Sequence, residues 1–154
     1  MHVIRESAAL PERRSTIYPP ELSIGFEGRI KRALTEALGL EQFGVNLTTL
    51  EPGAKSSHRH WHKVEDECVY ILSGTATLVT DEGDTVLTAG MAAGFPAGEA
   101  NAHHLINRGA EPVTFLEIGT RSADEVATYA DVDLHGIKTG GLFRFFRKSG
   151  EPFK

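Results

Sequence analysis

Residues 58–74 read HRHWHKVEDECVYILSG and combine metal-binding side chains with the start of an apolar run. In an extended strand alternate side chains point to the same face, so His58, His60 and His62 share one face. Neutral imidazoles on one face can chelate a borderline divalent metal ion. Glu67 opens the next run and adds a carboxylate. This stretch therefore predicts a metal site carried by β-strands.

Short strand-like segments extend from this stretch along the chain. They contain β-branched and aromatic residues, and turns with Gly, Pro or Asp separate them. Short strands at nearly regular spacing favour an all-β sandwich or barrel. We expect strands at residues 43–50, 67–72, 75–80, 85–88, 91–95, 103–107 and 113–120.

The spacing of the first metal-binding segment resembles a motif of the cupin superfamily. The matching pattern is His60-x-His62-x4-Glu67-x6-Gly74. Gly53 stands where the motif has an earlier glycine, one residue further away than usual.

A second segment resembles the second cupin motif. It reads Gly90-x5-Pro96-x-Gly98, followed by His103-x3-Asn107. The gap between Gly98 and His103 is two residues longer than usual, so a bulge there could shift the strand register. His103 is the expected ligand because it precedes the asparagine by four positions, while His104 would point to the opposite face.

The resemblance covers roughly residues 43–120 and implies a double-stranded antiparallel β-helix, or jelly roll, with a metal ion inside. It implies His60, His62, Glu67 and His103 as the ligands. Three imidazoles and one carboxylate suit Zn, Fe, Mn, Ni or Cu ions and disfavour Ca and Mg. We therefore expect one divalent transition-metal ion as the cofactor.

A single domain with three parts is expected from the 154 residues. Residues 1–42 form an N-terminal arm with a short helix, since apolar side chains in Ile30–Leu38 fall at helical spacing. Residues 43–120 form the barrel, and residues 121–154 form a C-terminal extension. Ser122 and Glu125 match a capping box, which predicts a short helix through Tyr129.

Composition limits the class of partner. The formal net charge of -5 argues against a nucleic-acid binder, which would need a basic face. No apolar run has the length of a membrane span or of a secretory signal. Cys68 is the only cysteine, which favours a reducing compartment. The sequence predicts a cytoplasmic protein that binds a small molecule.

Several apolar side chains lie outside the motifs and predict a homodimer. They include Trp61, Ile17 and Tyr18 and the phenylalanines at 143, 145 and 146. Trp61 is expected to face away from the metal, under the N-terminal arm or at a subunit contact. His58 is expected to be a pocket wall or a solvated neighbour of the ligands, and Asn107 a hydrogen-bonding turn residue.

Function stays open at this level, because one fold hosts many activities. One hypothesis is a small metalloenzyme with oxygenase, isomerase or lyase chemistry, in which open positions on the metal accept a substrate oxygen. The alternative is a non-catalytic protein that binds a sugar or organic acid through its metal. The sequence offers His58 and His104 as possible bases and identifies no substrate.

Overall fold

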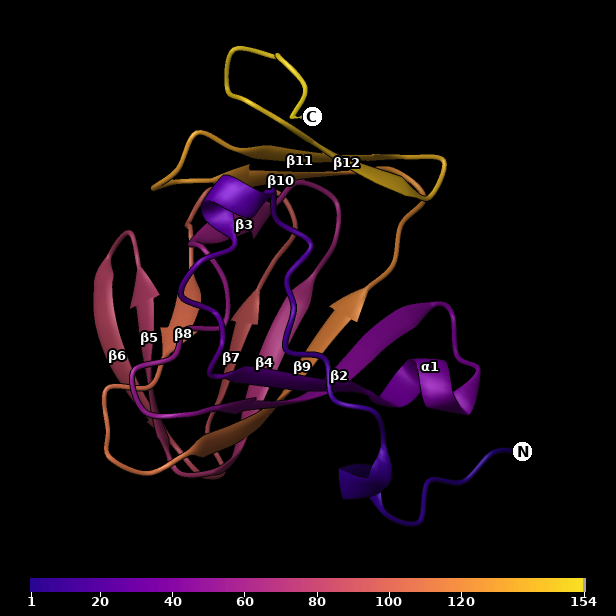
Figure 1. Ribbon diagram of the computed structural model, residues 1–154, viewed down its shortest axis with the longest axis vertical. Coiled ribbons are helices and arrows are strands. Elements are labelled where there is room, and N and C mark those ends of the chain that lie inside the picture. The colour runs from indigo at the N-terminus through magenta and orange to yellow at the C-terminus, as the bar shows by residue number, and fades with distance from the viewer. Residues whose placement is uncertain (154) are drawn as a thin grey trace.

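Antiparallel ladders between distant segments build a jelly roll in the computed structural model, which describes residues 1–153 (Figure 1). The largest sheet has the spatial order β1-β2-β9-β4-β7. Branched and aromatic side chains suit these strands, because one face of each packs on the core. The bounds are β1 Arg29–Ala33, β2 Phe43–Leu50, β9 Val113–Thr120, β4 Glu67–Ser73 and β7 Ala92–Phe95.

Two smaller sheets complete the barrel, with the orders β6-β5-β8 and β12-β11-β10-β3. They meet where the His60 N–H donates to the His103 carbonyl at 3.2 Å and the His103 N–H donates to the His60 carbonyl at 3.0 Å. We call this backbone bridge the seam. The bounds are β3 His60–His62, β5 Thr75–Thr80, β6 Gly83–Thr88, β8 His104–Ile106, β10 Glu125–Tyr129, β11 His135–Thr139 and β12 Leu142–Phe146.

The barrel closes on one apolar core. Its most deeply buried side chains are Leu50, Ile71, Val113 and Phe115, each fully shielded from solvent. They come from β2, β4 and β9, which are neighbours in the largest sheet. The all-β jelly roll is thus confirmed, and the strands expected between residues 43 and 120 end within two residues of their predicted limits.

Gly74 shows why the first motif needs a glycine after β4. Its φ is +78°, in the left-handed region that side chains disfavour. A Cβ at this position would lie 2.6 Å from the Pro112 carbonyl oxygen. The glycine therefore allows the β4–β5 turn to pass close to the segment that leads into β9.

The helix expected at Ile30–Leu38 is partly wrong. Residues 29–33 form strand β1, and only Leu34–Leu38 are helical, as α1. Strand β1 pairs in continuous register with β2, from Arg29 opposite Leu50 to Ala33 opposite Asn46. Interstrand hydrogen bonding therefore overrides the helical spacing of the apolar residues.

The helix expected from Ser122 through Tyr129 is wrong. Residues 125–129 form strand β10, which pairs with β3 on one side and β11 on the other. The Glu125 carboxylate does not cap a helix. It accepts hydrogen bonds from the backbone N–H groups of Lys63, Val64 and Glu65.

The part of the N-terminal arm around η2 and the C-terminal tail pack beside the β3–β10 ladder (Figure 1). From the N-terminal arm, which contains the short helices η1 (Ser7–Ala9) and η2 (Pro20–Leu22), Tyr18 packs on Tyr129 and Phe145 with ring centroids 5.6 and 5.9 Å apart. The tail thus contributes to a second small core outside the barrel. The domain limits at residues 42 and 120 stay a prediction. Within residues 1–153 no helix has the length and apolarity of a membrane span.

Candidate metal centre

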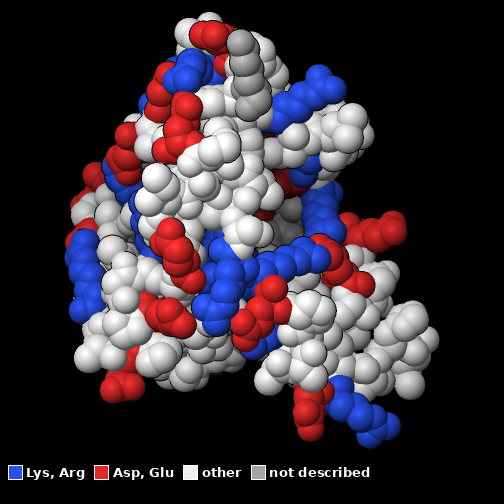
Figure 2. Space-filling view, viewed as in Figure 1, with Lys and Arg blue, Asp and Glu red and all other residues white. Residues whose placement is uncertain are grey.

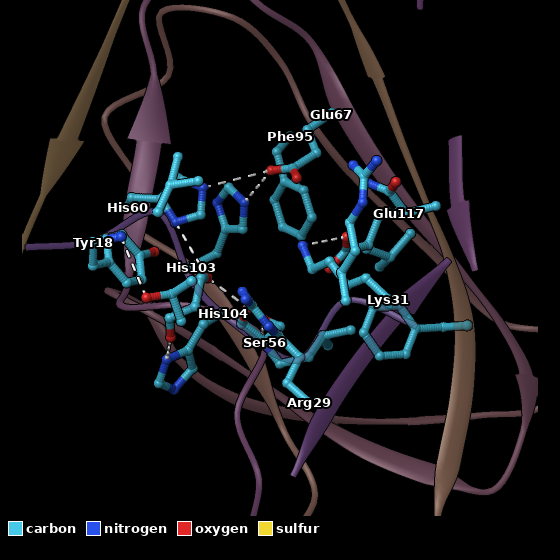
Figure 3. A pocket seen from close by; sticks show the side chains of 18 of the residues that line it. Tyr18, Arg29, Lys31, Ser56, His60, Glu67, Phe95, His103, His104 and Glu117 are labelled. Carbon is cyan, nitrogen blue, oxygen red and sulfur yellow. Dashed lines mark hydrogen bonds and ion pairs between the residues drawn. The ribbon is translucent and has the colours of Figure 1, made fainter. Parts of the chain in front are cut away.

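Three histidine side chains converge on one carboxylate oxygen, Oε2 of Glu67, and Figure 3 shows two of them, His60 and His103. The Nε2 atoms of His60, His62 and His103 lie 3.9, 3.8 and 2.9 Å from it. Strand β3 supplies the first two because alternate residues share a face. Strand β4 supplies Glu67 at its first position, and the seam brings His103 beside His60.

The Nδ1 atoms of the three rings face away from Glu67 Oε2 and toward other oxygen atoms. His60 Nδ1 lies 2.9 Å from the His58 carbonyl oxygen, and His103 Nδ1 lies 3.4 Å from the Asn101 carbonyl oxygen. His62 Nδ1 lies 4.0 Å from a Glu125 carboxylate oxygen. An oxygen acceptor at Nδ1 keeps the proton there and leaves the Nε2 lone pair free for a metal ion. His60 therefore directs an Nε2 lone pair at Glu67. His103 instead shares a hydrogen bond between its Nε2 and Glu67 Oε2 at 2.9 Å, and His62 Nδ1 has no hydrogen-bond partner within residues 1–153.

Glu125 fixes the loop between the histidine strand and Glu67. Its side chain is almost fully buried, and it accepts backbone hydrogen bonds from residues 63–65 and from Val126. Hydrogen bonds to a carboxylate are about twice as strong as neutral ones. Glu125 thus holds the relative positions of His62 and Glu67 without itself facing the cluster of Nε2 atoms.

The protonation states of His60 and Glu67 suit metal binding. Burial lowers the pKa of His60 to about 4, so its ring is neutral at neutral pH. Burial would raise the pKa of Glu67, but the hydrogen bond with His103 and the charges of the neighbouring imidazoles lower it to about 2. Metal ligands must be deprotonated, and a neutral imidazole beside an ionised carboxylate meets that condition.

A cavity of about 330 Å³ opens beside the cluster. His60, Glu67 and His103 form part of its wall, and Tyr18 and Tyr129 form another part. Burial raises the pKa of Tyr18 to about 12 and raises the pKa of Tyr129 well above its usual value, so both phenols stay protonated. This cavity has the volume of a small-molecule site.

Phe95 lines both this cavity, called the large cavity below, and a smaller one of about 210 Å³. Its ring stacks on His103 with centroids 3.5 Å apart. Trp61 and His62 line the smaller cavity. Trp61 thus borders a cavity that reaches His62 and His103, and its expected place at a subunit contact stays a prediction.

The remaining motif residues have structural partners. His58 Nε2 lies 2.8 Å from the Leu22 carbonyl oxygen, and the ring packs on Tyr18 and Phe26, so His58 fastens the arm. His104 lines the large cavity, and its Nδ1 lies 2.9 Å from the Ser57 carbonyl oxygen. Asn107 is fully buried and donates from its amide to two carbonyl oxygens, which confirms it as a hydrogen-bonding turn residue.

Three charged residues of the large cavity were not predicted from the sequence. Lys31 of β1 and Glu117 of β9 form an ion pair at 2.7 Å, and Arg29 lies two residues before Lys31 (Figure 3). Glu117 shares a strand face with Val113 and Phe115, so a charge at this alternating position was the available signal. Arg29 and Lys31 lay in a segment predicted as arm and helix.

Comparison with known proteins decides the family. A family model described as a cupin domain matches residues 46–119. A solved structure from Silicibacter pomeroyi, described as a sugar phosphate isomerase from a cupin superfamily, is 42% identical and covers 97% of this chain and 95% of its own, with a TM-score of 0.92. The chain belongs to the cupin superfamily.

Two further structures resemble this cupin. A protein from Acidithiobacillus ferrooxidans, provisionally described as a sugar phosphate isomerase, is 31% identical over 83% of each chain, with a TM-score of 0.74. A polyketide cyclase from Streptomyces resistomycificus is 22% identical over 78% of this cupin and 80% of its own chain, with a TM-score of 0.63, and shares the fold alone. A search of curated protein sequences gave no match.

Proposed function

We propose that this cupin is a metal-dependent isomerase of a sugar phosphate. The observation that carries the proposal is the convergence of three Nε2 atoms on Glu67, where His60, His103 and Glu67 form part of the wall of a charged cavity. The similarity to the Silicibacter pomeroyi protein, over nearly the whole length of both chains, supports the choice among cupin activities.

The proposed ligands are His60, His62, Glu67 and His103. Three imidazoles and a carboxylate fit Zn, Fe, Mn or Ni ions. The His58 carbonyl at His60 Nδ1 keeps the Nε2 lone pair of that ring available. A divalent ion held there would supply Lewis-acid stabilisation of negative charge on a substrate oxygen.

Glu117 is the proposed proton carrier. Aldose–ketose isomerisation moves a proton from the carbon beside the carbonyl to the carbonyl carbon, while a hydroxyl proton moves to the carbonyl oxygen. A base must take the first proton and return it to the neighbouring carbon. Glu117 lines the same cavity as the cluster, and its ion pair with Lys31 holds the carboxylate in place.

Exchange of the transferred proton with solvent tests the proposed function. The full chain, loaded in turn with Zn, Fe, Mn and Ni ions, is incubated in D₂O with a panel of aldose and ketose phosphates. We expect one isomer pair to interconvert with deuterium at the carbon beside the carbonyl, as measured by NMR. Binding of a panel member without any interconversion would instead favour the non-catalytic binding protein.

Single substitutions at the adjacent histidines separate the proposed ligand from its neighbour. His103→Ala removes an imidazole that points at Glu67, so we expect metal affinity to fall by at least about tenfold. His104→Ala removes a ring hydrogen-bonded to Ser57, so we expect the ion to remain bound. Metal titration of both variants measures the difference. Retention by His103→Ala with loss by His104→Ala would mean that the assigned register is wrong.

We also propose that two copies of this cupin associate through the apolar face beside β12. Ile17, Leu142 and Phe143 remain exposed there, at 73%, 67% and 37%. Ile17 and Phe143 line a groove together with Phe145 and Phe153. Light scattering at micromolar concentration is expected to give a dimer, and Leu142→Ser/Phe143→Ser a monomer. A monomeric wild type would contradict the proposal.

A further inference from the structure

Arg29 is a buried cation without a buried anion. Only 7% of the residue is exposed, and none of the ion pairs formed within residues 1–153 includes it. Two other cations of the large cavity are neutralised: Arg13 pairs with Glu36, and Lys31 pairs with Glu117. Two backbone carbonyls and the Phe26 ring, 5.5 Å from the guanidinium carbon, stabilise Arg29, but no carboxylate pairs with it. Because a buried charge is most stable beside an opposite charge, the position of Arg29 suits an anion from outside the chain.

The hydrogen bonds of Arg29 hold its guanidinium and leave donors free. Nη1 donates to the Ser56 carbonyl at 3.0 Å, and Nη2 donates to the Ser15 carbonyl at 2.9 Å. Within the described chain, Nε has no partner. Arginine carries five N–H groups, so each terminal nitrogen keeps one more. The two carbonyls therefore orient the planar group while part of its donor set stays unused.

The wall of the cavity carries more positive than negative side chains. Its cations are Arg13, Arg29, Lys31 and Arg121, four against the three carboxylates of Glu36, Glu67 and Glu117. Figure 2 shows Lys and Arg side chains gathered beside a hollow on one face of the molecule. A wall with this excess attracts an anionic ligand and disfavours a cationic one.

We propose that Arg29 is the anion-binding residue of the cavity and that it holds the phosphate group of a phosphate monoester. This inference rests on the proposed function and assigns the subsite that function requires. A planar guanidinium with free N–H groups on both terminal nitrogens matches two oxygens of a phosphate. The subsite and the His60–His103–Glu67 cluster border the same cavity, so one ligand can touch both.

Inorganic phosphate is the probe for this subsite, and Arg29→Gln is the variant. The full-length protein with its metal is titrated with phosphate at constant ionic strength, and binding is followed by calorimetry. We expect Arg29→Gln to bind phosphate roughly ten- to hundredfold more weakly, the range of a lost charge-assisted hydrogen bond. Arg29→Lys keeps the positive charge but lacks the planar guanidinium with its paired N–H donors. Its phosphate affinity should therefore lie between those of the wild type and Arg29→Gln.

Arg32→Gln is the matched control. Arg32 lies on the same strand and also has an unpartnered Nε, but it pairs with Glu12 and does not line the cavity. Its phosphate affinity should equal that of the wild type. Equal affinity of the wild type and Arg29→Gln would overturn the proposal, and tighter binding of glycolate than of phosphate would replace the phosphate monoester with a carboxylate.

Two further measurements keep the test decisive. If Arg29→Gln does not fold, the guanidinium NMR signals of wild-type Arg29 must shift on addition of phosphate and not of chloride; unmoved signals overturn the proposal. The His60→Ala/His62→Ala variant must still bind phosphate, because the subsite is separate from the metal. If the protein binds phosphate at Arg29 but isomerises no sugar phosphate, the subsite is supported and the proposed function is contradicted. If it isomerises a sugar phosphate without binding phosphate at Arg29, the proposed function is supported and the subsite is contradicted.

Discussion

Purified His60→Ala/His62→Ala protein is expected to carry almost no metal. The two substitutions remove two of the three Nε2 atoms that converge on Glu67. Glu67 and His103 alone leave too few donors to hold a transition-metal ion against water. Elemental analysis of protein purified without a metal-affinity tag should show a fall from about one ion per chain to near zero.

Thermal unfolding provides a second measurement of the same prediction. A ligand that binds only the folded state stabilises that state, so a chelator should lower the melting temperature of the wild type. The double variant should not respond to the chelator. His135→Ala, on β11 outside the cluster, serves as the control and should keep its ion. Unchanged metal content in the double variant would contradict the proposed site.

Glu117→Gln is expected to lower kcat roughly 10²–10⁴-fold while the metal content stays the same, because general-base catalysis contributes about that factor. The amide keeps the shape of the side chain and its place opposite Lys31 but cannot accept a proton. Deuterium incorporation at the carbon beside the carbonyl should fall by the same factor. The measurement uses the isomer pair that the wild type interconverts.

Glu36→Gln is the control for this loss. Glu36 borders the same cavity and pairs with Arg13, but its side chain is about half exposed. Its kcat should match that of the wild type. An undiminished kcat in Glu117→Gln, with the ion still bound, would mean that another group carries the proton.

Local patterns predicted the barrel strands well because turns delimit them. Gly74 needs its left-handed backbone, and the turn residues before β6 and β7 likewise end one strand and start the next. The two wrong helix predictions lie outside residues 43–120. In those segments, pairing with distant strands decides the secondary structure. Residues 29–33 form strand β1 because they pair with β2. Residues 125–129 form strand β10 because they pair with β3 on one side and β11 on the other.

The candidate ligands were predictable because their chemistry is concentrated in two short motifs. The rest of the cavity was not, because its charges come from strands that meet only in the fold. Glu117 looks like an ordinary charge in a strand until β1 places Lys31 opposite it. Arg29 becomes unusual only when burial and the lack of a carboxylate neighbour are known.

Because the seam brings His60 and His103 together, the proposed metal site can form only at a late stage of folding. The two residues are 43 positions apart, so both sheets must close before their rings meet. Closing such a long-range contact is slow compared with forming a single hairpin. During refolding, the absorbance of a bound coloured ion such as Co(II) would therefore report the time at which the barrel closes. Formation of single strands or hairpins would not produce this signal.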